Sequence, residues 1–220
     1  MTLTTPADLR HAAAKVGVVL SEGESERLVA FGELLHRWNQ RINLTGPGSL
    51  SDILERQVLD CLMIDLLPWP GHALHVADIG SGAGLPGLIV ALRHPDFEVT
   101  SLERTGKKIS FQQEAVRLLE LTRVSLLRED AWSHARAGGS GRYDVALARG
   151  FADLASTLPL AAALLKPGGL LRTFKGAKLS AELEKIPAGT RALFSREFEQ
   201  RAYQVPETGA AGILVQFRRA

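Results

Sequence analysis

A glycine-rich stretch from Val76 to Gly87, V-A-D-I-G-S-G-A-G-L-P-G, carries the residue types best suited to hold a ligand. An apolar run containing Asp78 comes before glycines at positions 80, 82 and 84. Glycine lacks a Cβ, so it adopts positive φ readily and lets a ligand lie against bare backbone. A strand that ends in such a turn and leads into a helix can cradle a nucleotide or nucleoside. The stretch therefore predicts a nucleoside-binding turn between a strand and a helix.

Two cofactor classes use turns of this kind. The dinucleotide pattern G-x-G-x-x-G can be placed from Gly82 to Gly87, with Glu103 near the position of a ribose-binding acid. Begun at Gly80, directly after the predicted strand, the pattern fails because Leu85 replaces the third glycine. An acid two residues ahead of alternating glycines is instead typical of adenosylmethionine-dependent methyltransferases. The turn favours S-adenosylmethionine, with a dinucleotide as the alternative.

Two later predicted strands end in further candidate ligands for a nucleoside. In an open parallel sheet, ligands bind beyond the carboxyl ends of the strands. Glu103 ends the second predicted strand, where it can accept hydrogen bonds from both ribose hydroxyls or cap the next helix. Asp130, Ala131 and Trp132 follow the third strand. Their backbone groups and flat indole could hold adenine, or they could form a helix cap with a core tryptophan.

Two cations follow the next strands, at the place where cofactor and substrate should meet. Arg149 follows the fourth predicted strand and Lys175 the fifth. An arginine there can bind a carboxylate, a phosphate or the edge of a guanine. The six histidines form no ligand constellation, so we expect no metal. No nucleophilic serine elbow or carboxylate pair favours hydrolase chemistry.

The composition is that of an ordinary globular chain. The 220 residues, 45% of them apolar, suffice for a good-sized α/β core. One cysteine, Cys61, excludes an internal disulfide, and M-T-L-T-T-P-A-D lacks the features of a secretory signal, so we expect a cytoplasmic protein. The apolar runs are far shorter than the roughly 20 residues of a membrane span. The net charge of +2 permits nucleic-acid binding without requiring it.

The order of predicted elements divides the chain near residue 70. Residues 1–70 are predicted to form a helical cap of three helices, which begin near Thr5, Ser21 and Ser49 or Ser51. Residues 71–220 then alternate strand and helix, with strands near 74–79, 98–103, 124–128, 143–148 and 170–175, and helices near 86–93, 105–120, 153–165 and 179–186. The last two predicted strands, 194–204 and 212–218, should form an antiparallel hairpin. We therefore predict an α/β class I methyltransferase fold, with a Rossmann-like, mostly parallel sheet.

Six segments between residues 38 and 176 together resemble the RsmG family, also called glucose-inhibited division protein B. The segments are W-N-Q-R-I-N-L-T (38–45), R-Q-V-L-D-C (56–61), D-I-G-S-G-A-G-L-P-G (78–87), S-L-E-R-T-G-K-K-I-S-F (101–111), A-R-G-F-A (148–152) and F-K-G (174–176). Members of this family are bacterial 16S rRNA guanine-N7 methyltransferases. The L-P-G and the asparagine-leucine-threonine run are far more specific than the glycine turn alone.

The resemblance implies S-adenosylmethionine as cofactor and 16S rRNA, or the small ribosomal subunit, as partner. We further expect a monomer that contacts no membrane. The predicted cofactor contacts are Gly80, Gly82, Leu85, Glu103, Asp130, Ala131, Trp132 and Arg149, and Arg149 is also the predicted catalytic residue. Other family motif positions, which we expect on the RNA-facing side, are Asn43, Thr45, Arg56, Asp60, Lys107, Lys108 and Lys175.

The implied chemistry needs alignment rather than a base. Guanine N7 has an in-plane lone pair and no proton, so it can attack the methyl group without a general base. Arg149 is therefore expected to orient the guanine or a phosphate. Three residues depart from the family pattern: Gln57 and Cys61 stand where histidine and serine are common, and Gly150 stands where alanine is. The alternatives are a methyltransferase for another RNA or a small molecule, and a non-catalytic RNA-binding ribosome-assembly factor.

Overall fold

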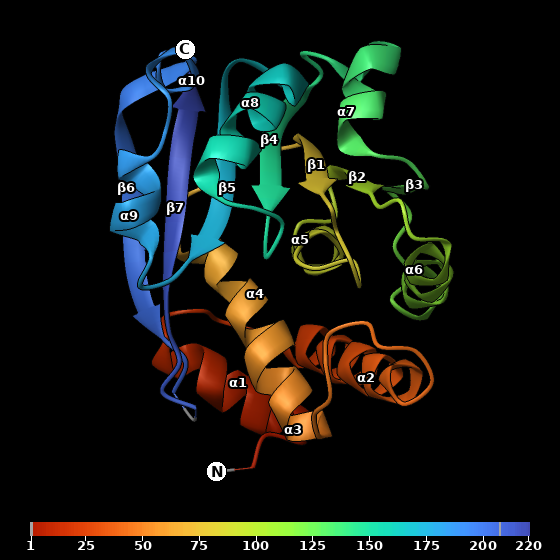
Figure 1. Ribbon diagram of the computed structural model, residues 1–220. Helices are drawn as coiled ribbons and strands as arrows, with labels where there is room; N and C mark the ends of the chain where they lie inside the picture. The colour runs from red at the N-terminus through yellow and green to blue at the C-terminus, as the bar shows by residue number, and fades with distance from the viewer. Residues whose placement is uncertain (1, 207) are drawn as a thin grey trace.

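A seven-stranded sheet runs through the computed structural model, which describes residues 2–206 and 208–220 (Figure 1). The strands are β1 His75–Ile79, β2 Glu98–Leu102, β3 Val124–Leu127, β4 Tyr143–Ala148, β5 Leu165–Lys175, β6 Phe194–Gln204 and β7 Ala211–Arg219. Their order in the sheet is β3-β2-β1-β4-β5-β7-β6, and β7 runs antiparallel to both its neighbours while the others are parallel. The predicted methyltransferase layout, with its terminal hairpin, is confirmed.

The strand order reverses between β1 and β4. The chain proceeds outward from β1 to β2 and β3, then returns to place β4 on the other side of β1. Such a switch point opens a crevice at the carboxyl ends of the two strands. The topology therefore brings the turn after Ile79 next to the residues that follow Ala148.

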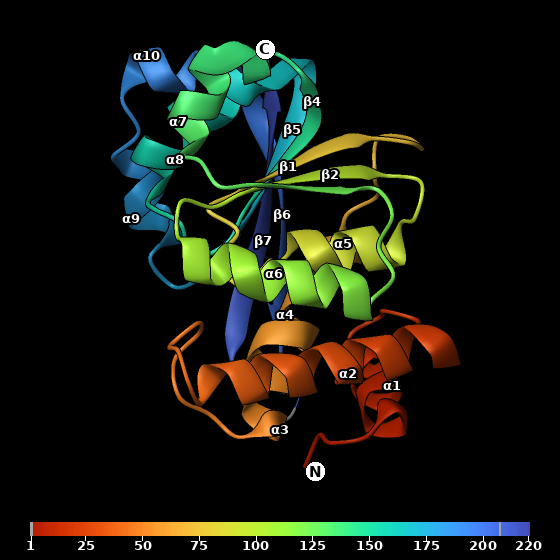
Figure 2. The same ribbon diagram turned by 90° about the vertical axis from the view of Figure 1, so that its right-hand side faces the viewer.

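Helices cover both faces of the sheet, which Figure 2 shows edge-on. Below it in that view lie α5 Gly87–Arg93 and α6 Gly106–Leu118. On the other side, at the top and left of the view, lie α7 Ala131–His134, α8 Leu154–Leu164, α9 Leu179–Glu184 and α10 Ala188–Arg191. The alternation of strand side chains fits this arrangement. Val76 belongs to a buried cluster with Val90 of α5, whereas Ala77 belongs to one with Leu158 of α8. Apolar residues on both strand faces thus explain the two helical layers.

The N-terminal segment is helical, as predicted. It comprises α1 Pro6–Lys15, α2 Glu22–Asn39 and a continuous helical run of α3 Leu50–Ile53, a π-type turn Leu54–Leu59, α4 Asp60–Leu62 and a 3₁₀ turn Met63–Leu66. Thr5, Ser21 and Ser49 cap the three helices, each in a reciprocal bond pattern with an acid three residues later. The capping residues read from the sequence are confirmed, with Ser49 rather than Ser51 starting the third helix.

The cap packs on the α5 and α6 side of the sheet. Trp38 donates a hydrogen bond of 2.9 Å to Glu114 of α6, and its ring meets Phe111 edge-on at 5.7 Å. Arg93 of α5 forms ion pairs of 2.8 Å with Asp65 and Glu24 of the cap. The division of the chain into two domains, residues 1–70 and 71–220, stays a prediction.

Two element boundaries and one additional helix differ from the sequence prediction. Helix α5 begins at Gly87, because Pro86 lies just before the helix as its N-cap residue. Strand β5 starts at Leu165 and makes an irregular register with β4, since Gly168 adopts φ +78° within the strand. Helix α10 was not expected. Among the described residues, no helix is both long and apolar enough to cross a membrane.

Candidate active site

The glycine turn after β1 has the backbone conformation that the sequence requires. Gly80, Gly82 and Gly84 adopt φ values of +63°, +59° and +75°. A Cβ at Gly84 would come within 2.4 Å of Leu88, whereas a Cβ at Gly82 would have no atom nearer than 4.0 Å. Gly84 is therefore required by packing. The backbone of Gly82 faces open space in which a ligand can lie.

A buried polar network fixes this turn to α6. Gln112 donates hydrogen bonds of 2.8 Å to the Gly82 carbonyl and 2.9 Å to the Ser81 hydroxyl. Ser101 of β2 donates to Gln112 at 2.6 Å and contacts Ser81 at 2.5 Å. Buried hydrogen bonds of this kind hold a turn in one conformation before a ligand arrives.

Glu103, directly after β2, binds the same turn. Its Oε2 accepts a hydrogen bond of 3.1 Å from Gly82 N and its Oε1 accepts one of 2.7 Å from Thr105 N. The residue is 6% exposed, and Lys108 Nζ lies 3.9 Å from Oε2. Each carboxylate oxygen can accept a second hydrogen bond, so Glu103 can bind two hydroxyls while it also holds the turn and the start of α6.

Asp78 offers a buried carboxylate oxygen without a partner. Its Oδ2 accepts a hydrogen bond of 2.8 Å from Gly87 N, at the start of α5. Its Oδ1 is one of only two buried side-chain polar atoms without a partner in residues 2–206 and 208–220; the other is His36 Nδ1. Burial raises the pKa of Asp78 to about 7, although the Gly87 hydrogen bond and the charge of Arg149 oppose this shift. A cation or donor on a ligand would complete this group.

The L-P-G of the turn has a structural explanation. A Cβ at Gly87 would come within 2.6 Å of Asp78 Oδ2, so only glycine lets the helix backbone approach that carboxylate. Leu85 is 5% exposed and belongs to the buried cluster shared with the cap. Its side chain therefore packs in the core, and its N–H donates a hydrogen bond of 2.9 Å to the Ser81 carbonyl. Only the carbonyl of Leu85 is left for the predicted cofactor contact.

Asp130, Ala131 and Trp132 begin α7. Asp130 Oδ1 accepts hydrogen bonds from Trp132 N at 3.0 Å and Ser133 N at 3.1 Å, so Asp130 caps this short helix. Ala131 is buried, but Trp132 is 39% exposed. The alternative of a core tryptophan is wrong. The indole remains available for stacking against a flat ligand ring.

Arg149, after β4, is bound to the cap. Nε donates to Asp60 Oδ2 at 2.9 Å, Nη1 to Gln57 Oε1 at 2.9 Å and Nη2 to the Arg56 carbonyl at 2.6 Å. Asp60 Oδ1 also accepts a hydrogen bond of 2.6 Å from Tyr203. The structure thus brings together Arg149, Asp60 and one family departure, Gln57. Direct contact of Arg149 with a cofactor or substrate stays a prediction.

Lys175, after β5, is likewise paired. Its Nζ lies 2.8 Å from Glu182 Oε2 and donates a hydrogen bond of 2.9 Å to the carbonyl of Ala152. The Lys175 side chain is 7% exposed. The sequence suggested an available second cation here. The structure instead shows a buried ion pair that holds the loop after β4. Burial raises the pKa of Cys61, a second residue that departs from the family pattern, to about 12, so its thiol is un-ionised and unreactive.

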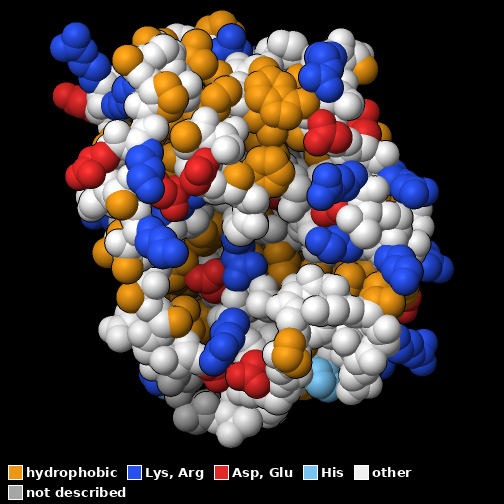
Figure 3. Space-filling view, viewed as in Figure 1, with side chains coloured by type: hydrophobic (Ala, Val, Ile, Leu, Met, Phe, Trp, Pro, Cys, Tyr) orange, Lys and Arg blue, Asp and Glu red, His pale blue; other side chains and the backbone are white. Residues whose placement is uncertain are grey.

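A groove of about 470 Å³ opens beside the turn, between the ends of β4 and β5 and the terminal hairpin. Figure 3 shows this side of the molecule, hollowed near its centre where acidic and basic side chains lie among hydrophobic ones. Side chains that line it include Asp60, Phe151, Phe174, Lys175, Lys178 and Tyr203. The sequence analysis gave no role to Phe151, Tyr203 or Glu182, although Phe151 lies in the A-R-G-F-A segment. For Phe151, the available signal was a large apolar residue in a loop directly after a strand-end arginine.

The remaining expected RNA contacts lie in two places. Asn43, Thr45 and Arg56 belong to the cap near the loop that follows α2, and Asn43 accepts a hydrogen bond of 2.8 Å from Gly46 N. Lys107 and Lys108 lie on α6, over which basic side chains gather at the right of Figure 3. Lys108 lies 3.9 Å from Glu103, which binds the glycine turn, and the Arg56 carbonyl accepts a hydrogen bond from Arg149, so each group adjoins the candidate site.

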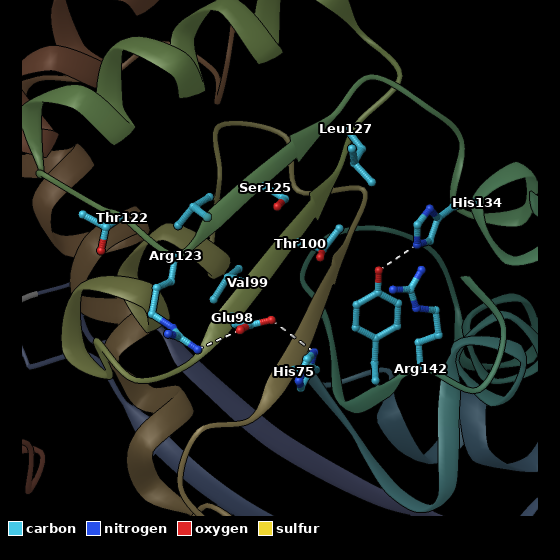
Figure 4. Close-up of a pocket in the computed structure, with 12 residues that line it drawn as sticks. His75, Glu98, Val99, Thr100, Thr122, Arg123, Ser125, Leu127, His134 and Arg142 are labelled. Atoms are coloured by element: carbon cyan, nitrogen blue, oxygen red, sulfur yellow. Dashed lines mark hydrogen bonds and ion pairs between the residues drawn. The ribbon is translucent and has the colours of Figure 1, made fainter. Parts of the chain in front are cut away.

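A larger cavity, of about 580 Å³, lies elsewhere (Figure 4). Several of its lining residues, including His75, Glu98 and Tyr143, begin strands, so it lies toward the amino ends of the sheet. Glu98 pairs there with Arg123 at 2.7 Å and with His75 at 3.4 Å. No predicted site residue lines this cavity. In the described part of the chain, no group of three or more His, Cys, Asp or Glu residues could hold a metal ion.

The turn has the features that an aminoacyl nucleoside requires. Open backbone at Gly82 leaves room for the nucleoside, and Glu103 has acceptors for ribose hydroxyls. Trp132 exposes a flat surface for a base. Asp78 Oδ1 has no hydrogen-bond partner, and an ammonium group could donate to it. These features fit S-adenosylmethionine.

Comparison with known proteins shows the family of the chain. Residues 24–207 match the family described as GidB, rRNA small subunit methyltransferase G. The chain is 35% identical over 212 residues to ribosomal RNA small subunit methyltransferase G of Geobacter sp. (strain M21), covering 96% of each protein.

Solved structures show the same fold at lower identity. A protein from Agrobacterium tumefaciens described as a predicted O-methyltransferase matches with a TM-score of 0.60 at 20% identity, over 73% of this chain and 80% of that one. A tRNA (m1A58) methyltransferase from Aquifex aeolicus matches with a TM-score of 0.54 at 17% identity, over 73% and 68% of the respective chains.

Proposed function

Because the chain belongs to the GidB family, rRNA small subunit methyltransferase G, we propose that it transfers a methyl group from S-adenosylmethionine to guanine N7 of 16S rRNA. The observation that carries the proposal is the adjacency of two surfaces. The open glycine turn, with Asp78 and Glu103, adjoins the groove lined by Phe151 and Tyr203. One surface suits the cofactor, and the other suits a base presented to it.

The proposed reaction depends on alignment. The bound cofactor supplies an electrophilic methyl group, which the lone pair of N7 can take without loss of a proton. Glu103 and Asp78 would hold the nucleoside and amino-acid parts of the cofactor, and Trp132 would cover its adenine. Arg149 would hold Asp60, the cap residue that lines the groove, and no side chain needs to act as a general base.

The proposed partner is 16S rRNA, free or within the small ribosomal subunit, and the proposed place of action is the cytoplasm. Lys107 and Lys108 on α6 and Arg56 of the cap would bind phosphates of the RNA backbone. The target guanine would have to be unpaired or flipped out, because its N7 must reach a recessed groove. We propose that one copy of the chain suffices, since the turn and the groove come from a single chain.

A transfer assay tests this proposal. Purified protein is incubated with S-adenosylmethionine labelled in its methyl group and with small subunits, or naked 16S rRNA, from cells that lack the enzyme. Label should enter the RNA, and digestion to nucleosides should yield 7-methylguanosine. Label absent from RNA, or found on protein, would refute RNA methylation. Label in another nucleoside would refute the N7 assignment alone, and binding of RNA without transfer would favour a non-catalytic assembly factor.

A further inference from the structure

Phe151 is a large hydrophobic residue that the fold leaves exposed beside the glycine turn. It is 41% exposed and lines the groove. Its ring lies against Gly80, because a Cβ built on Gly80 would come within 2.4 Å of Phe151 Cδ2 and 3.0 Å of Cε2. The ring thus borders the cofactor turn on one side and the groove on the other. The exposed face of the ring is therefore open to a flat ligand.

We propose that Phe151 is the stacking platform for the methylated base. The inference rests on the proposed function and deepens it by naming the residue that would bind the target purine. Proteins bind unstacked bases on aromatic side chains, since every base has a π-face that can stack. The ring adjoins the turn that would hold the cofactor. A base stacked on it would therefore lie near the methyl donor.

The lining of the groove favours a base over a phosphate. Lys175 and Lys178 are balanced by Asp60 and Glu182, so the charged side chains around the groove sum to zero. Phe174 and Tyr203 pack edge to face at 6.4 Å and extend the aromatic wall. A phosphate site would instead concentrate cations. The lining suits a flat, largely uncharged ring.

The loop that carries Phe151 is held from both ends. Arg149, two residues earlier, is fixed by three acceptors in the cap. After Phe151, Lys175 binds the Ala152 carbonyl at 2.9 Å, and Glu182 accepts a hydrogen bond of 2.9 Å from Leu154 N. Lys175 and Glu182 also pair with each other at 2.8 Å. The ring is therefore preorganised, which reduces the entropy lost when a base stacks on it.

Stacking on Phe151 should also favour the reaction itself. As the S–CH₃ bond breaks and the N7–CH₃ bond forms, positive charge passes from sulfur to the base and no proton moves. The face of an aromatic ring attracts a cation. Contact with Phe151 would therefore strengthen toward the cationic product, and an interaction that strengthens in the transition state raises kcat.

Phe151→Leu and Phe151→Tyr test the proposal. The leucine keeps an apolar side chain against Gly80 but removes the π-face, whereas the tyrosine keeps it. We expect Phe151→Leu to lower kcat on rRNA about 10- to 100-fold, with a smaller change in KM because phosphate contacts remain. Phe151→Tyr should stay within about threefold of the unmutated protein. Adenosylhomocysteine affinity by calorimetry and Tm should change little in either variant.

Leu193 offers a matched control for Phe151, and specific results would contradict the proposed stacking role. Leu193→Ala removes a similarly exposed apolar side chain, 43% exposed, that does not line the groove, and should leave kcat unchanged. Wild-type-like kcat in Phe151→Leu would overturn the inference and leave the proposed function intact. Parallel losses of adenosylhomocysteine affinity or Tm would overturn it too, since they indicate structural support only. An unmutated protein that methylates no RNA would overturn the proposed function and the inference together.

Discussion

Arg149 and Asp60, which are 89 positions apart, join the end of β4 to the helical cap through a 2.9 Å hydrogen bond between Nε and Oδ2. Asp60 also accepts a hydrogen bond from Tyr203 of the terminal hairpin at 2.6 Å. One carboxylate thus links the cap, the switch point of the sheet and the hairpin. The site is built from three distant parts of the chain, and this joint sets their relative position.

The joint predicts strong coupling in a double-mutant cycle. Arg149→Gln, Asp60→Asn and the double variant should give a coupling free energy of about 1–3 kcal/mol in urea unfolding, because both side chains are about four-fifths buried. The pair Arg123 and Glu98 is the matched control, since these side chains are 46% and 49% exposed and should couple by only about 0.2–1 kcal/mol. Equal coupling in the two cycles would contradict the prediction.

Alanine substitutions at Gly82 and Gly80 should affect stability and adenosylhomocysteine affinity to different extents. Gly82→Ala meets open space, so it should cost about 1 kcal/mol of stability from positive φ and also weaken adenosylhomocysteine binding by filling the cradle. Gly80→Ala should cost more stability, because its Cβ collides with Phe151. Calorimetry and urea unfolding separate the two effects.

Gly17→Ala is the control for backbone strain alone. Gly17 has φ +83°, with no atom within 4 Å of an added Cβ, and follows α1 in the cap. It should lose stability without losing affinity for adenosylhomocysteine. If Gly82→Ala bound adenosylhomocysteine as tightly as Gly17→Ala, the turn would not be the cofactor cradle.

Local sequence signals predicted most of the fold. Capping residues such as Thr5 and Ser21 define helix starts through bonds within four residues, and alternating strands and helices fix the parallel sheet. The positive φ of Gly80 and Gly82 also follows from local backbone sterics. These elements were predictable because each depends on a few neighbouring residues.

The side chains of the site were less predictable because their partners are distant in sequence. Arg149 marks the correct strand end, but nothing near it indicates that its guanidinium turns to Gln57 and Asp60. Lys175 similarly meets Glu182 only after α9 folds back. The exposure of Phe151 depends on the whole groove. Sequence therefore indicated which strand ends could form a site, while the structure was needed to show which of their side chains are already bound within the protein.

Glu103→Gln predicts weaker cofactor binding with little change in stability. The amide keeps one acceptor for Gly82 N or Thr105 N but loses the charge and half the acceptor capacity. Adenosylhomocysteine affinity should fall about 10- to 100-fold, since hydrogen bonds to a charged group are worth about 1.5–3 kcal/mol. Calorimetry measures the change. Glu98→Gln, at an exposed carboxylate at the opposite end of β2, should bind normally. An unchanged affinity in Glu103→Gln would exclude a ribose contact.

Asp78 predicts that cofactor binding depends on pH. Burial raises the pKa of this carboxyl to about 7, so below that pH it is protonated in the free protein. The ammonium group of adenosylhomocysteine would favour the carboxylate, and binding in acid must then release the proton. Affinity should therefore rise by up to about tenfold per pH unit toward pH 7 and level off above it. Calorimetry in buffers of different ionisation enthalpy should detect the released proton.

Asp78→Asn separates this effect from other titrations. The amide binds no proton, so the affinity of the variant should be lower and nearly independent of pH in the same range. The stability of the free protein should instead fall as the pH rises. Because the folded pKa of Asp78 is raised from 3.8, its contribution to stability is full below the unfolded pKa and is lost as pH rises through about 7. Urea unfolding should show this decline in the unmutated protein and a flatter profile in Asp78→Asn. A pH dependence of binding that persists in Asp78→Asn would place the titrating group elsewhere.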